Sequence, residues 1–267
     1  MRSVVLSGLL FAVSCSTPVE APVEFDDLCA FVFEHGSDED PEALAAGITN
    51  LQNWLDQNRD SVEEGYVVNN LDPAWVEEHE GKPYDLMDLL GVALAMEYNH
   101  PLERILERIL HDQTDPSFDE EGRLTNKRTY NSDRECFIAG TCDFVSYETE
   151  AIQNYPLGIE ATVKFHSELR RVETASGPAV VARNWMTAPS DFNWEWLTLD
   201  LSYYLAVIVE KEPGLVERTE ATWMLAGFAG APVSIEMGLS MALDKMRDGA
   251  IGFRNGLDAE FPNPTPP

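Results

Sequence analysis

The sequence has little positive charge: 18 lysines and arginines stand against 47 aspartates and glutamates, a formal net charge of −29. A polyanion such as nucleic acid would be repelled by this chain, so nucleic-acid binding is excluded as a function. A basic protein partner is compatible with the acidic surface. Solvated surface charge is the simpler interpretation.

The motifs of several enzyme classes are missing. The chain has no GxSxG, HExxH, GxGxxG or P-loop motif, and no CxxC pair that would indicate a zinc ribbon or a redox site. Carboxylates are so numerous that an acid/base pair cannot be located from spacing. We therefore predict no catalytic residue and no organic cofactor.

The first hydrophobic run, Val4–Val13, is too short for a transmembrane helix, which needs about twenty residues. It follows Arg2 and ends in small residues, the layout of a secretory signal peptide. Residues 12–15, AVSC, resemble the lipobox of bacterial lipoproteins, although Ala12 stands where that family prefers leucine. The resemblance implies cleavage after residue 14, acylation of Cys15 and a membrane-anchored protein of the cell envelope, in the periplasm or at the cell surface. An ordinary cleaved signal with an unmodified cysteine is the alternative.

Composition divides the rest of the chain. After the signal peptide (1–14) we expect a lipidated cysteine with a flexible, proline-containing spacer (15–24). A helical region (25–123) and a region of antiparallel sheet plus a C-terminal helix (124–256) follow. Residues 257–267 form a proline-rich tail.

The remaining cysteines fit an exported protein. Cys136 and Cys142 lie six residues apart around Ala139-Gly140, and this short loop favours a local disulfide in an oxidising compartment. Cys29 could instead pair with either of them, which would leave one thiol free.

The first half has helical periodicity. Leu44, Ile48, Leu51 and Leu55 form one apolar face and predict a helix over residues 41–58. The nearly continuous apolar stretch 84–96 predicts a buried helix, and another helix is expected to begin at Pro101. Residues 112–123, rich in acids and interrupted by proline and glycine, predict a loop.

The second half changes to a period of two. Apolar residues occupy the odd positions from Leu197 to Val209 and predict a long strand. Further strands are predicted around residues 163–170, 180–187 and 215–225. The short turns at 176–178 and 213–214 imply antiparallel neighbours. A final helix is expected after Pro232.

Strands followed by a long terminal helix resemble the helix-grip arrangement of the START and polyketide-cyclase-like superfamily, over about residues 124–253. The predicted fold class is therefore α+β. The resemblance implies a sheet wrapped around the helix and a cavity for a lipid, a sterol or another apolar molecule. Aromatic and methionine side chains suit such a pocket, although each could equally be core material. The candidates are Trp185, Trp196, Tyr203, Trp223, Met237, Met241 and Met246.

Two polar clusters could hold a metal ion. Asp56, Asn58 and Asp60 match half of a calcium-binding loop, but Ser61 and Val67 stand where that loop needs glycine and glutamate, so a plain acidic turn is the alternative. A second set recurs at helical spacing, and we interpret it as a solvated face rather than a transition-metal site. Its members are His100, Glu103, Glu107 and His111.

Three functions follow from these observations. The first is a non-catalytic, lipid-anchored envelope protein that binds an apolar small molecule or lipid between sheet and helix. The second is an interaction or structural lipoprotein with an acidic partner-binding surface. The third is an enzyme on the same scaffold, a cyclase or hydrolase with carboxylates or His166 lining the pocket.

Overall fold

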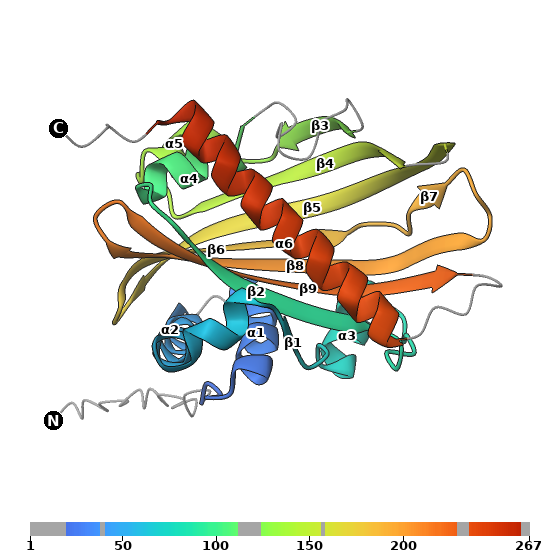
Figure 1. Ribbon diagram of the computed structural model, residues 1–267, viewed down its shortest axis with the longest axis horizontal. Coiled ribbons are helices and arrows are strands. Elements are labelled where there is room, and N and C mark those ends of the chain that lie inside the picture. Colours follow the sequence, from blue (N-terminus) through green and yellow to red (C-terminus); the bar gives the residue numbers. More distant parts are fainter. Residues whose placement is uncertain (1–19, 38–40, 112–123, 156–157, 229–234, 263–267) are drawn as a thin grey trace, which may run out of the picture.

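The computed structural model describes residues 20–37, 41–111, 124–155, 158–228 and 235–262. In these residues nine strands form one antiparallel sheet in the order β1-β2-β9-β8-β6-β5-β4-β3, with β7 paired to β5 off this path (Figure 1). The strands are β1 (Tyr66–Val67), β2 (Leu90–Tyr98), β3 (Leu124–Tyr130), β4 (Phe144–Tyr155), β5 (Ile159–Thr174), β6 (Gly177–Met186), β7 (Asp191–Phe192), β8 (Leu197–Glu212) and β9 (Leu215–Phe228).

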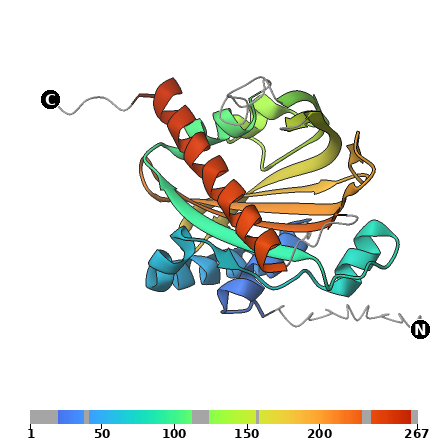
Figure 2. The ribbon, with the colours of Figure 1, turned by 45° about the vertical axis from the view of Figure 1, so that its right-hand side comes forward.

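The sheet curves around one long helix. Figure 2 shows α6 (Ile235–Glu260) lying across the concave face, so the predicted helix-grip arrangement of an α+β fold is confirmed. Two short helices, α4 (Leu102–Ile109) and α5 (Arg134–Ile138), lie on the same side. The convex face carries α1 (Phe25–Glu34), the 3₁₀ turn η1 (His35–Ser37), α2 (Pro41–Glu63) and α3 (Pro73–Glu80). Among the described helices none has the length and apolarity needed to cross a bilayer.

Both faces of the sheet are covered, and each has its own hydrophobic core. The convex core joins α1 and α2 to the sheet through side chains such as Phe33, Leu51 and Trp223. The concave core lies at one end of the sheet, where Phe137, Phe253 and Ile208 bring α5, α6 and β8 together. Because these two cores lie on opposite faces, the alternation of a strand assigns each residue to one of them.

A row of large side chains crosses the convex face and ends at a glycine. Its members are register partners on β5, β6, β8, β9 and β2, in that order: His166, Trp185, Tyr203, Trp223 and Gly91. A Cβ atom at Gly91 would lie 2.8 Å from the Trp223 ring and from the Val68 carbonyl oxygen. Glycine is therefore required where the indole ring crosses β2.

Helix α3 docks onto this row. The Asp72 carboxylate caps the helix by accepting from the backbone N–H groups of Ala74 and Trp75. The His79 ring stacks on the Trp75 ring at a centroid distance of 4.7 Å and meets the Trp185 ring edge-on at 5.0 Å. Aromatic contact, rather than a long apolar stripe, holds this short helix in place.

Some predicted elements differ from those observed. The stretch 84–96 contains no helix: strand β2 begins at Leu90 and pairs with β9 along its whole length. A strand covered on both faces lacks the polar alternation that reveals most strands, so its apolar run resembles a buried helix. The region 25–123 thus contributes β1 and β2 to the sheet. Helix α6 continues to Glu260, four residues beyond the predicted end of the sheet-and-helix region at residue 256.

The local disulfide is confirmed. Cys136 at α5 bonds to Cys142, with Cα atoms 5.3 Å apart, while Cys29 is a buried free thiol. The signal peptide, Cys15 and the loop at residues 112–123 lie outside the described residues.

Candidate ligand-binding cavity

A cavity of about 430 Å³ lies between α6 and the concave face of the sheet. This volume is within the range of pockets that hold small organic ligands. Its walls come from β3, β4, β5, β6, β8, β9, α4 and α6. Residues that line it include Ile109, Tyr147, Thr149, Ala151, Phe165, Ser167, Leu169, Ala182, Asn184, Ser202, Tyr204, Ala206, Thr222, Met246 and Phe253.

Small side chains at the middle of the concave face explain the empty volume. Ala182 on β6 and Ala206 on β8 are direct register partners, and Ser167 and Ser202 line the same face. Helix α6 packs mainly on β2, which lies between β1 and β9 and two strands away from β8. The helix therefore spans the small residues without filling the space above them.

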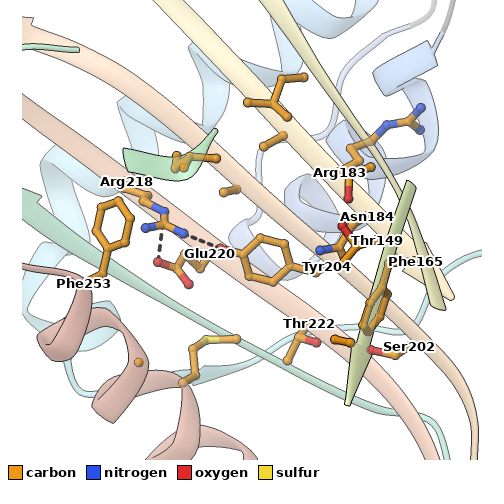
Figure 3. A pocket seen from close by; sticks show the side chains of 18 of the residues that line it. Thr149, Phe165, Arg183, Asn184, Ser202, Tyr204, Arg218, Glu220, Thr222 and Phe253 are labelled. Atoms are coloured by element: carbon orange, nitrogen blue, oxygen red, sulfur yellow. Dashed lines mark hydrogen bonds and ion pairs between the residues drawn. The ribbon is translucent and has the colours of Figure 1, made fainter. Parts of the chain in front are cut away.

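A buried charged cluster forms part of the wall. Arg218 and Glu220 are two residues apart on β9, so both side chains point to the concave face, where they are 9% and 6% exposed. The Nε atom of Arg218 lies 3.0 Å from Oε1 of Glu220, and its Nη2 atom donates to the Tyr204 hydroxyl at 2.6 Å (Figure 3). The guanidinium carbon lies 4.5 Å from the centre of the Phe253 ring.

This cluster keeps unused hydrogen-bonding capacity. Among the described residues, Nη1 of Arg218 and Oε1 of Glu220 are buried without a hydrogen-bond partner of good geometry. Leaving such groups unpaired in a protein interior costs free energy, so each is a site for a polar atom of a ligand or for water.

The ionisation of the cluster is fixed at ordinary pH. Burial raises the pKa of Tyr204 well above its usual value, and burial does the same for Tyr98 nearby. Glu220 and the two tyrosines raise the pKa of Arg218 further, against the opposing effect of burial. Tyr204 therefore stays a neutral phenol and Arg218 a permanent cation, and both suit binding more than proton exchange near pH 7.

The predicted pocket residues are divided between the two faces of the sheet. Met246 on α6 lines the cavity. Trp185, Tyr203 and Trp223 occupy the convex row instead, where they pack against the N-terminal helices. The remaining three are exposed outside the cavity lining, at 38% for Trp196, 52% for Met237 and 57% for Met241.

Sequence reasoning missed the charged cluster. The signal available was a pair of charges, Arg218 and Glu220, at alternate positions inside a strand that is otherwise suited to burial. Charged residues are rarely buried without pairing, so this spacing predicts a pair on one face.

The proposed calcium ligands lie at the end of α2. The Asp56 carboxylate accepts from Nζ of Lys211 at 2.6 Å, and the Asn58 side chain donates to the Trp54 carbonyl oxygen at 3.0 Å. The Asp60 side chain lies outside the described residues, and within the described part of the chain no three potential ligands meet as a metal-binding group. Calcium binding here stays a prediction.

Two histidines have other surroundings than expected. His100 is only 2% exposed and lies 2.9 Å from Asp258 of α6, so its interpretation as part of a solvated face is wrong. It precedes Pro101 and therefore lies before α4 rather than on it. His166 lies on the convex face between Glu148 and Glu168, at 2.6 and 3.3 Å, away from the cavity.

Comparison with known proteins gives likeness of fold only. No family model and no curated protein matches the chain. The chain is similar to the lipid transfer and protein localization domain of human StarD13 (13% identity, 78% of this chain and 95% of that one, TM-score 0.43). It is also similar to a STAR-related lipid transfer protein from Xanthomonas axonopodis (8%, 72% and 92%, 0.45) and to human STARD10 (9%, 79% and 80%, 0.42). These are START proteins, the superfamily that the element order resembles. At such scores they contribute nothing to the functional argument, which rests on the cavity.

Proposed function

We propose that this protein binds a small molecule or lipid that has an apolar body and at least one polar group. The observation that carries the proposal is the cavity of about 430 Å³ whose mixed wall includes the buried Arg218–Glu220 ion pair, in which Nη1 of Arg218 has no hydrogen-bond partner among the described residues. Apolar side chains such as Phe165 and Met246 would contact the body of the ligand. The charged cluster would fix its orientation, as a few placed polar groups do in most ligand sites.

We further propose that the protein acts at a membrane of the cell envelope, anchored through acylated Cys15. This rests on residues 1–15 of the sequence, whose hydrophobic run and AVSC segment resemble a lipobox. Mass spectrometry of the N-terminal peptide from the protein made in a bacterial host tests it. A diacyl mass on Cys15 supports the anchor, and an unmodified or absent Cys15 contradicts it.

Titration with the neutral fluorescent probe N-phenyl-1-naphthylamine tests the cavity. Ala151 lines the cavity, is 4% exposed and lies outside both hydrophobic cores, so a larger side chain there would project into the empty volume. We expect one probe per chain, with binding weakened at least tenfold in Ala151→Phe.

The matched control is Ala46→Phe, the same substitution at an exposed position of α2. It should leave probe binding unchanged. Equal binding by both variants would place the probe on the surface and contradict the proposal. A circular dichroism spectrum of each variant shows whether it has folded.

A further inference from the structure

We infer that the ligand is an anionic amphiphile whose negative head group lies against Arg128 in the cavity wall. This inference rests on the proposed function and specifies the chemical class of its ligand. It follows from how positive charge is distributed in a strongly acidic chain.

The cavity lining contains more basic than acidic residues, although the whole chain is strongly acidic. Five of its 18 basic residues line the cavity, whereas Glu220 is the one carboxylate among the described lining residues. Arg183 contributes little charge to the interior, because its guanidinium donates to Glu168 and to the Phe33 carbonyl oxygen on the convex side. The other four cations are Arg108, Arg128, Arg218 and Lys245.

Two of these cations share one aromatic ring. The guanidinium carbons of Arg108 and Arg218 lie 5.5 and 4.5 Å from the centre of the Phe253 ring. Each has a carboxylate nearby, Glu260 at 3.0 Å from Arg108 and Glu220 at 3.0 Å from Arg218. The two pairs therefore come close to neutrality, with the Nη1 hydrogens of Arg218 still without an acceptor among the described residues.

Arg128 adds positive charge to the cavity wall. Its Nη1 atom donates to the carbonyl oxygens of Ile109 and His111 at 2.6 and 2.9 Å, and its guanidinium lies over the Tyr147 ring. Carbonyl oxygens satisfy hydrogen bonds without cancelling the charge. Its Nε atom is buried and has no partner in the described part of the chain. On the neighbouring strand its register partner is Thr149, another residue of the cavity lining.

Neutral side chains line much of the cavity as well. Phe165, Ser202 and Thr222 lie away from the Arg218 side of the wall (Figure 3). A molecule with a negative group at Arg128 would place its body among these neutral side chains. Desolvated charge pairs discriminate strongly between ligands, because the wrong ligand leaves a buried charge unmatched.

Isothermal titration calorimetry of the full chain, stripped of lipid, tests the inference with three probes of one chain length. Dodecanoate is negative, dodecanol is neutral and dodecylammonium is positive at pH 7.4. We expect dodecanoate to bind at least tenfold more tightly than either of the others. Arg128→Gln should weaken dodecanoate binding about tenfold and leave dodecanol binding unchanged.

Lys164→Gln is the matched control, since it removes one positive charge at an exposed site on β5 that does not line the cavity. It should not alter binding of any probe. If dodecanol or dodecylammonium binds as tightly as dodecanoate, the charge selectivity is overturned while the cavity function stands. If none of the three binds, the proposed function itself fails. An equal loss of dodecanoate affinity in both variants would indicate a general charge effect and overturn the assigned head-group position.

Discussion

Removal of Arg218 alone is expected to be strongly destabilising. In Arg218→Met the Glu220 carboxylate stays buried, at 6% exposure, without the cation 3.0 Å away. Tyr204 loses its hydrogen-bond donor, and Phe253 loses the guanidinium 4.5 Å from its ring. Breaking a buried ion pair on one side costs about 3–5 kcal/mol, a large part of the stability of a typical domain.

Removal of both charges should restore most of the stability. In the double variant Arg218→Met with Glu220→Leu no charge stays unpaired, so we expect its free energy of unfolding to lie within about 1 kcal/mol of the native value. Urea denaturation followed by tryptophan fluorescence measures both effects, and similar m-values would show that the unfolding transition is comparable.

The exposed pair Lys164–Glu150, 3.9 Å apart, serves as the control. Lys164→Met should cost less than about 1 kcal/mol, because surface ion pairs contribute little. If Arg218→Met also costs less than 1 kcal/mol, or if the double variant is as unstable as the single one, the cluster is not a buried, mutually dependent pair and the reasoning is refuted.

Three further predictions concern stability. Replacing Cys136 and Cys142 by serine opens a loop of sequence separation 6 and should lower the free energy of unfolding by about 2 kcal/mol. Dithiothreitol should lower the free energy of unfolding of the native chain but not that of the serine variant. Partial burial lowers the pKa of His79 below 6.5, so the unfolded chain gains the proton first and stability falls as the pH drops through 6.5. His79→Gln should flatten that fall in urea midpoints measured from pH 7.5 to 5, and an unchanged slope would contradict it. Gly91→Ala should cost about 1–3 kcal/mol by thermal or urea unfolding, because the new methyl group meets Trp223, and a neutral effect would contradict the packing.

The sequence predicts this fold best where a strand has one recognisable face. The alternation from Leu197 to Val209 identifies β8, and the turn at Gly214, with φ of +82°, marks the hairpin to β9. Strand β2 is not predicted as a strand, because both of its faces are covered and the residues on both faces are mostly apolar. The paired residues of β2 and β9, from Tyr98–Val216 to Leu90–Met224, are 118 to 134 positions apart in the chain, so their pairing leaves no local signal.

Most of the predicted pocket residues, though not Met246, lie away from the cavity for a related reason. Periodicity separates the two faces of a strand but does not say which face meets a core and which meets an empty space. Large aromatics such as Trp185, Tyr203 and Trp223 fill a face completely, so they mark the packed side. The cavity forms over the small residues Ala182 and Ala206, which hydrophobicity alone does not distinguish from ordinary strand residues.

The most direct test of the account is native mass spectrometry of the protein purified from a bacterial host, followed by organic extraction and identification of what is released. We predict one bound molecule per chain, an acid with an apolar body of a size that fits about 430 Å³, and its loss in Ala151→Phe but not in Ala46→Phe. A native chain that carries no ligand and gains none from a lipid extract, or one whose bound molecule persists in Ala151→Phe, would contradict the claim that this cavity is a ligand site.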